Sequence, residues 1–286
     1  MTWIPKGLSD AQPAQPYRSS PGGEGARSPN GTVNVAQDIA LSVIMPCYQG
    51  ERFIENSIRV VNSELLSLEQ SFEIVVVVDG FLDRAFERAK ALEPETRNLI
   101  VIGYEENCGK GYAIAFGARH CRGRYVAILD SDLDYHPRAL SGFFAIAEEG
   151  RADLVIGNRR DPRSTYQYPW IRKLFSIGFN IYVNILFPKM KIWDTQAGIK
   201  LVRRPAASAI FETLETSAGT HGYVVDIYIL MIARSKNFRI VQAPCDFNMR
   251  ESSIGTGGKF LRVAWKMGRD VLEARSEIQR MTKYDT

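Results

Sequence analysis

The sequence predicts an α/β fold in which a mostly parallel β-sheet is flanked by helices, and two observations predict it. From Ala40 onward, short apolar runs alternate with segments of helical periodicity. These runs are continuously apolar, which is typical of strands that helices cover on both faces of a parallel sheet. Ligands of such sheets bind beyond the carboxyl ends of the strands, so we expect the functional residues there.

The elements follow in a regular order through the first half of the chain and less regularly afterwards. The apolar runs predicted as strands are residues 41–46, 72–80, 98–107, 124–132, 152–160 and 238–245. The segments with helical spacing are residues 51–66, 82–92, 109–121, 205–215, 223–237 and 259–284. Residues 168–187 form an apolar-aromatic stretch with few charges, which suits either a buried core helix or a helix at a bilayer interface.

Three segments of different composition are expected along the chain. Residues 1–37 are rich in Pro, Gly, Ser and Gln and predict a disordered tail, because such a stretch buries too little apolar surface to offset its ordering entropy. Residues 38–258 are expected to form the catalytic domain. Residues 259–286 predict a basic amphipathic helix that either packs on this domain or lies on anionic lipid.

Composition excludes several classes of protein. Of the 286 residues, 45% are hydrophobic and 24% charged, which argues against a disordered or fibrous chain. A net charge of 36 − 32 = +4 is too small to imply nucleic-acid binding, but it suits anionic small molecules or an anionic lipid surface. The four cysteines form no C-x-x-C pair, so we expect neither a disulfide framework nor a zinc site. No apolar run approaches 18 residues, so no membrane-spanning helix is expected.

The strongest chemical signal is Asp130-Ser131-Asp132 at the end of an apolar strand. Two carboxylates two residues apart can be brought onto one hard cation by a turn, and Mg²⁺ and Mn²⁺ prefer carboxylates together with substrate phosphate oxygens. A solvated acidic turn is the alternative. A weaker signal is Lys110, flanked by Gly109 and Gly111 at a helix entry, which suits contact with a phosphate or ribose. Neither a P-loop nor a G-x-G-x-x-G pattern occurs, which argues against a dinucleotide oxidoreductase.

Five motifs together resemble a known family. VIMPCYQGERFIENSI, FEIVVVVDG, NCGKGYAIAFGA, YVAILDSDLDYHP and DTQAGIKLVRR occur in the order seen in family 2 glycosyltransferases, and more narrowly in polyprenyl-phosphate (dolichyl-phosphate) glycosyltransferases. The resemblance covers about residues 40–260. It implies a GT-A fold with peripheral membrane-interface helices, and transfer from a nucleoside diphosphate sugar with inversion at the anomeric carbon.

The resemblance also implies roles for individual residues. The positions implied to bind the nucleotide sugar are Pro46, Tyr48, Glu51, Asp79, Lys110 and Asp130. Asp130 and Asp132 match the metal-binding acids, with Gln196 completing the site for Mg²⁺ or Mn²⁺. Two departures occur: one acid of the usual Asp-Asp-Gly is Val78, and the usual Glu of F-D-x-E is Tyr228.

The acceptor half contains the cations that a lipid phosphate requires. Such a phosphate is already mostly anionic near pH 7, so it needs cations to position it more than a base to deprotonate it. Arg159, Arg172 and Lys200 are the predicted phosphate contacts, and by the resemblance Arg172 and Ser176 open a helix beside the membrane. Ordinary surface charges are the alternative for each.

Asp226 lies in an apolar helical context and has two interpretations. It is either a catalytic base beside Asp130 and Asp132, or a structural acid that holds Arg250 or Lys200.

The sequence therefore predicts an inverting glycosyltransferase, peripheral on the cytoplasmic face of a membrane, that transfers a hexose to a polyprenyl phosphate. The form of DTQAGIK favours UDP-glucose as donor, with UDP-N-acetylhexosamine and GDP-mannose behind it. The alternatives are a soluble family 2 enzyme with a small-molecule or polysaccharide acceptor, a nucleotidyltransferase, and a catalytically silent binding module.

Overall fold

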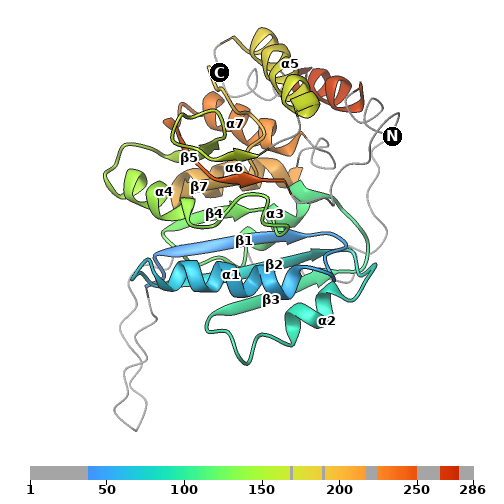
Figure 1. Cartoon of the computed structure of the whole chain (residues 1–286), viewed down its shortest axis with the longest axis vertical. Coiled ribbons are helices and arrows are strands. Elements are labelled where there is room, and N and C mark those ends of the chain that lie inside the picture. Colours follow the sequence, from blue (N-terminus) through green and yellow to red (C-terminus); the bar gives the residue numbers. More distant parts are fainter. Residues whose placement is uncertain (1–37, 168–169, 189–190, 217–223, 250–264, 277–286) are drawn as a thin grey trace. The chain divides into compact units, whose positions relative to one another are not determined.

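The computed structural model describes residues 38–167, 170–188, 191–216, 224–249 and 265–276, and it leaves the predicted tail 1–37 outside this description. A seven-stranded sheet in the order β3-β2-β1-β4-β7-β5-β8 forms its centre (Figure 1). The strands of this sheet are β1 Leu41–Cys47, β2 Phe72–Asp79, β3 Leu99–Tyr104, β4 Tyr125–Leu129, β5 Leu154–Asn158, β7 Ile199–Arg203 and β8 Ile240–Pro244. The short strands β6 (Tyr166–Gln167) and β9 (Phe247–Asn248) pair separately.

The sheet is mostly parallel, as the apolar runs predicted. β1 pairs in parallel with both β2 and β4, and β2 with β3. The exception is β7, which runs antiparallel between β4 and β5 and which periodicity had not identified as a strand. In its register, Lys200 lies opposite Ile128 on one side and Ile156 on the other, so a lysine occupies the middle of the sheet.

Helices cover both faces of the sheet, and the alternation of side chains along the strands explains why. In β1, Val43 and Met45 belong to one buried cluster, whereas Ile44 belongs to the other. The helices that contribute to the first cluster are α1 Ile54–Leu66, α2 Ala85–Lys90 and α4 Ala139–Glu148. Those that contribute to the second are α3 Lys110–Ala118, α6 Arg204–Thr216 and α7 Val225–Ser235.

The helix α5 (Trp170–Leu186) lies on the second cluster beside a helical segment at residues 265–276. The hydroxyl of Tyr182 donates a hydrogen bond to the carbonyl of Gly268 at 3.0 Å, and Val271 and Ala274 are fully buried. The predicted basic helix therefore packs against the catalytic domain along the part that is described. No helix in the described ranges is both long and apolar enough to cross a membrane.

Candidate active site

The predicted acidic and glycine-rich segments meet at one edge of the sheet. Asp79 ends β2, and Asp130 directly follows β4. The strand between them, β1, ends at Cys47, which is in register with Val78. Because these strands are parallel and adjacent, their carboxyl ends bring the loops together as the sequence predicted.

Asp79 organises the loop that leads into α3. Its buried carboxylate accepts hydrogen bonds from the backbone N–H of Cys108 (2.7 Å) and of Gly109 (2.9 Å), and from the side-chain amide of Asn107 (2.9 Å). Gly109 has φ of +88°, a conformation that favours glycine. Asp79, one of the residues predicted to bind the nucleotide sugar, is thus also the group that fixes the Gly-rich entry directly before Lys110.

The other residues predicted to bind the nucleotide sugar lie at the end of β1 and in the loop that follows it. Glu51 and the β2–α2 loop hold each other: the Glu51 N–H donates to Asp83 at 2.9 Å, and the Glu51 carboxylate accepts the N–H of Arg84 at 3.2 Å. Pro46 lies within β1, and Tyr48 is exposed. Tyr48 and Glu51 therefore follow the end of β1, which is in register with the end of β2, and the Tyr48 side chain is exposed.

Four charged side chains, from two helices, one strand and the loop after β4, form a continuous chain of ion pairs. The ammonium of Lys110, on α3, lies 2.7 Å from the Asp130 carboxylate and 3.4 Å from that of Asp226, on α7. Asp226 in turn accepts from Lys200 of β7 at 2.5 Å, and Lys200 also donates to the carbonyl of Ala197. Lys200 is fully buried, so it has no exposed surface to offer a phosphate in this arrangement.

Asp226 is electrostatically fixed as an anion. Burial raises the pKa of a carboxyl group, but Lys110 and Lys200 outweigh it and hold the pKa of Asp226 below its ordinary value. Burial opposes the charge of Lys110, yet Asp130 and Asp226 raise the pKa of its ammonium. A carboxylate with a lowered pKa is a weaker proton acceptor, so these contacts favour the structural interpretation of Asp226 over the catalytic base. Of its two expected partners, Lys200 is present and Arg250 lies outside the described residues.

The pair Asp130 and Asp132 fits a hard divalent cation. Burial, together with the carboxylates of Asp130 and Asp134, raises the pKa of Asp132 to about 7. A divalent cation relieves this crowding of like charges, and two carboxylates suffice where substrate phosphates complete the coordination. Among the described residues no group of three acidic, Cys or His side chains gathers to form a complete protein cage.

The backbone next to this pair leaves no room for a side chain. The N–H of Asp130 donates to the carbonyl of Gly198 at 3.2 Å. A Cβ atom at Gly198 would lie 2.0 Å from the Asp130 carboxylate, so a larger residue there would force that side chain to move. The backbone therefore approaches Asp130 closely at the glycine of DTQAGIK, directly before β7 begins.

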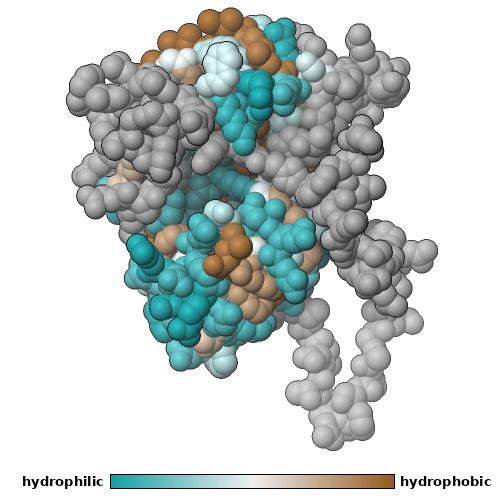
Figure 2. Space-filling view, turned by 90° about the vertical axis from the view of Figure 1, so that its right-hand side faces the viewer, coloured by the Kyte–Doolittle hydropathy of each residue, from teal (hydrophilic) through white to brown (hydrophobic). Residues whose placement is uncertain are grey.

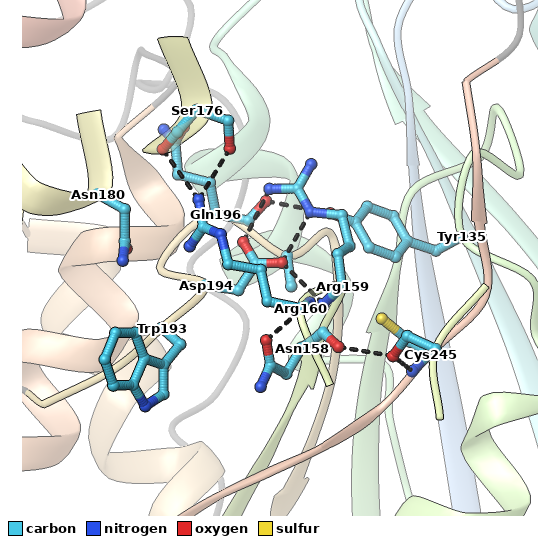
Figure 3. A network of polar contacts seen from close by, with 12 residues as sticks. Tyr135, Asn158, Arg159, Arg160, Ser176, Asn180, Trp193, Asp194, Gln196 and Cys245 are labelled. Carbon is cyan, nitrogen blue, oxygen red and sulfur yellow. Dashed lines mark hydrogen bonds and ion pairs between the residues drawn. The ribbon is translucent and has the colours of Figure 1, made fainter. Parts of the chain in front are cut away.

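The acceptor half contains a second network, drawn in Figure 3. Arg159 forms a bidentate ion pair with Asp194, with both N···O distances at 2.7 Å, and its guanidinium lies 5.0 Å from the centre of the Phe247 ring. Both charged side chains are buried. The structure thus directs Arg159, a predicted phosphate contact, toward an internal carboxylate.

The neighbouring Arg160 points elsewhere, toward α5. Its guanidinium donates to the carbonyl of Ser176 at 3.0 Å and to the Ser176 hydroxyl at 3.3 Å (Figure 3). Within the described ranges Arg160 hydrogen-bonds to neutral groups, and it is only half-buried. Among the described residues its guanidinium therefore forms no ion pair of the kind that Arg159 forms, although its charge also helps to lower the pKa of Asp194. The side chain of Arg172, one turn earlier on α5, lies outside the described residues.

Gln196 lies in the segment between Asp194 and Lys200, which belong to the two different networks. Its carbonyl accepts the hydroxyl of Tyr135 at 3.5 Å, and the segment continues from Asp194 through Gly198 to Lys200. Figure 3 draws Gln196 among the residues of the second network. Its metal role stays a prediction.

One functional candidate, Asp194, was missed in the sequence. It is the first residue of DTQAGIK, a motif that was assigned a role only through its glutamine. The contact between Lys110 and Asp226 spans 116 positions and carries no local signal.

One side of α5 is apolar and exposed. Ile177, Ile181 and Ile185 follow one another at helical spacing and are 37%, 54% and 71% exposed. Figure 2 shows hydrophobic surface where this helix lies. The large apolar side chains of Trp193 (67%) and Trp265 (79%) are exposed as well.

Comparisons with known proteins give a matching family model and several relatives. The family model described as "Glycosyl transferase family 2" matches residues 42–211. Glycosyltransferase AglD of Haloferax volcanii is 27% identical over 81% of this chain, which spans only 38% of that relative's length. The dolichyl-phosphate beta-glucosyltransferase ALG5A of Trichomonas vaginalis is 29% identical over 75% of this chain and 68% of its own. The corresponding Dictyostelium discoideum enzyme is 26% identical over 77% of this chain and 70% of its own.

Solved structures share the GT-A fold. Glucosyl-3-phosphoglycerate synthase from Mycobacterium tuberculosis superposes with a TM-score of 0.61 at 18% identity, covering 83% of this chain and 80% of its own. One structure of that enzyme is a complex with Mn²⁺, uridine diphosphate and its product. Mannosyl-3-phosphoglycerate synthase from Rubrobacter xylanophilus has a TM-score of 0.63 at 18% identity. The match covers 85% of this chain and 75% of that enzyme's chain.

Proposed function

Because the chain belongs to glycosyl transferase family 2, we propose that it transfers a hexose from a nucleoside diphosphate sugar, UDP-glucose first, to a polyprenyl phosphate. Family membership makes it a glycosyltransferase, which sets aside the nucleotidyltransferase and the silent binding module. The donor is proposed to bind across the ends of β1, β2 and β4. There Tyr48 and Glu51 border the nucleoside and Asp79 fixes the loop beside it.

Asp130 and Asp132 are the residues that would hold Mg²⁺ or Mn²⁺, with Gln196 as a further ligand. When bound, the cation supplies positive charge that neutralises the diphosphate leaving group. Lys110, whose ammonium contacts both Asp130 and Asp226, is a second cation on the same side. The chain's own contribution is to orient the donor so that the anomeric carbon faces the acceptor half, where attack from the opposite face inverts the sugar's configuration.

The observation that carries the lipid acceptor is the two-sided character of α5. On one side Ser176 accepts hydrogen bonds from Arg160, so a cation lies beside this helix. On the other side the exposed residues Ile177, Ile181 and Ile185 suit the apolar part of a bilayer. A phosphate whose tail is a polyprenyl chain requires both features at once. The names of the dolichyl-phosphate relatives agree with this acceptor.

We propose that Arg160, together with Arg172, positions the lipid phosphate. Arginine suits this role because its planar fork binds two phosphate oxygens and stays charged when partly desolvated. Arg159 and Lys200 are proposed to act indirectly, because their charges are directed to Asp194 and Asp226. On this account the protein lies on the cytoplasmic face of a membrane, with α5 and Trp265 in the interface.

A donor screen tests this function. Radiolabelled UDP-glucose, UDP-N-acetylglucosamine and GDP-mannose are each incubated with Mn²⁺, a short polyprenyl phosphate and the full chain. We expect label from UDP-glucose in the organic phase, and none when the lipid phosphate is replaced by the free polyprenol. Label that stays in the aqueous phase with every donor, while UDP is released on addition of a small-molecule acceptor, would favour the soluble alternative instead.

A further inference from the structure

The ion-pair chain at the edge of the sheet gives Lys110 two carboxylate partners. Its ammonium is 2.7 Å from Asp130 and 3.4 Å from Asp226. We propose that Lys110 substitutes for the divalent cation at Asp130 when no metal is bound, and that it moves its contact to Asp226 when the metal binds. This inference rests on the proposed metal site at Asp130 and Asp132.

Lys110 and a divalent cation compete for the carboxylate of Asp130. A carboxylate oxygen that accepts from an ammonium at 2.7 Å is engaged, and a divalent cation at the same carboxylate meets electrostatic repulsion from that ammonium. Lys110 and the carboxylate of Asp130 are both largely buried, so water screens this repulsion only in part. Metal binding at Asp130 therefore requires Lys110 to withdraw.

The carboxylate of Asp226 is a fixed acceptor for the Lys110 ammonium when it leaves Asp130. Asp226 binds Lys200 through one oxygen, at 2.5 Å, and turns the other oxygen toward Lys110. Lys200 is itself fixed, because it belongs to β7 in the middle of the sheet and donates to the carbonyl of Ala197. Asp226 is thus a positioning residue, which holds a place for Lys110 without touching the donor.

The proposal predicts how each charge affects metal affinity. Removing the Lys110 ammonium abolishes the competition, so metal binds more tightly. Removing the Asp226 carboxylate leaves Lys110 only Asp130 as a partner, so metal binds more weakly. If both effects act through Lys110, the second effect vanishes once Lys110 is gone.

The test measures Mn²⁺ binding to the metal-free full chain without nucleotide, from the electron paramagnetic resonance signal of free Mn²⁺. We expect Lys110→Met to bind Mn²⁺ about tenfold more tightly than wild type, the effect of one charge-assisted contact. Lys90→Met is the matched control. Lys90 ends α2, outside the site, and its ammonium lies 2.8 Å from the Glu93 carboxylate in an ion pair of its own. This control should stay within about twofold of wild type. Equal affinity of Lys110→Met and wild type would overturn the proposal.

A double-mutant cycle separates positioning from mere structural support. Asp226→Asn is expected to weaken Mn²⁺ binding about tenfold, Asp226→Glu to restore it, and Asp226→Asn to have little effect in the Lys110→Met background. An equal loss of Mn²⁺ affinity in both backgrounds would contradict the movement of Lys110 from Asp130 to Asp226. Melting temperatures identify folded variants, and Lys110→Gln replaces Lys110→Met should the latter not fold.

Asp132→Asn separates failure of this inference from failure of the proposed metal site. If Asp132→Asn binds Mn²⁺ as wild type does, the metal site itself is wrongly placed. If Asp132→Asn loses binding while Lys110→Met matches wild type, only the competition by Lys110 is refuted.

Discussion

At the scale of single residues, the site depends on carboxylates whose surroundings give them different tasks. Asp79 accepts backbone N–H groups and shapes a loop. Asp226 lies between two ammonium groups and stays ionised. Asp132 lies among other carboxylates, where its pKa is raised to about 7, and this is the environment that a cation stabilises. The same functional group thus serves as loop organiser, counter-ion and proposed metal ligand.

Asp132→Asn tests the metal role directly. We expect it to abolish most turnover and the metal-dependent part of donor binding, because the amide oxygen is a neutral and weaker ligand. The fold should persist, since the change removes a like charge from a crowded site. Steady-state kinetics and donor titrations with and without Mn²⁺ make the measurement. Activity near that of wild type with Mn²⁺ present would refute the assignment.

Asp153 is a residue outside the site whose ionisation supports the fold. Burial raises the pKa of this carboxyl, but hydrogen bonds from Arg239 and Arg203 outweigh it and hold the pKa below its ordinary value. A depressed pKa means that the stabilisation is complete above the unfolded value, about 3.9, and is lost as the pH falls through the folded value.

Asp153→Asn should therefore lower the free energy of unfolding by about 1–3 kcal/mol at pH 7 and by less at pH 3. Urea unfolding at the two pH values measures the difference. The control is Asp161→Asn, whose partner Arg163 is largely exposed, and it should cost under about 1 kcal/mol. A loss for Asp153→Asn that is independent of pH would show that its ionisation does not matter.

At the scale of elements, α5 carries both the proposed lipid-phosphate contact and the proposed membrane contact. Its inner side includes Asn180 and Asn184, whose amides donate to the carbonyl of Ile192 at 3.4 Å and 2.9 Å. Its outer side exposes Ile181 and Ile185. These hydrogen bonds tie the helix to the segment that leads to Asp194, so the exposed side has a fixed orientation.

Replacing the outer isoleucines with Asp should weaken membrane binding. We expect the double variant Ile181→Asp, Ile185→Asp to bind anionic vesicles at least tenfold more weakly, because each isoleucine in the bilayer contributes on the order of 1.5–3 kcal/mol. Vesicle sedimentation measures binding. Leu66→Asp, Leu82→Asp is the matched control, since both leucines are exposed on other elements. Equal losses in the two double variants would show only a charge effect.

The cations near α5 should act on the acceptor rather than the donor. We expect Arg160→Ala and Arg172→Ala each to lower kcat/KM for polyprenyl phosphate about ten- to a hundredfold, with the donor KM nearly unchanged. Kinetics that vary lipid and donor separately measure this. A collapse of donor binding with an unchanged lipid KM would place these arginines at the diphosphate instead.

At the scale of the whole molecule, the sequence predicted the parallel half of the fold better than the rest. Apolar runs such as residues 72–80 and the acids that follow them are local signals, so β2 and the edge at Asp79 and Asp130 were foreseeable. The antiparallel β7 was not, because its five residues include Lys200 and Arg203, and a charged residue within a buried strand breaks the apolar pattern.

The same limit applies to the site. Motifs identified Lys110 and Asp130 separately, but their pairing with Asp226 and Lys200 arises only when β7 pairs with β4 and α7 joins the same buried cluster. Likewise, Arg159 and Arg160 are adjacent and look equivalent in sequence. Their different directions, toward Asp194 and toward Ser176, are set by the backbone after β5 and by the position of α5.

The most direct test of the central claim is to identify the product of UDP-glucose, a short polyprenyl phosphate and Mn²⁺ by ³¹P and ¹H nuclear magnetic resonance. The account predicts one new phosphodiester joining the hexose to the polyprenyl phosphate, formed in step with UDP and inverted at the anomeric carbon relative to the donor. A product that retains the donor's configuration, or UDP release with the polyprenyl phosphate left unmodified, would contradict it.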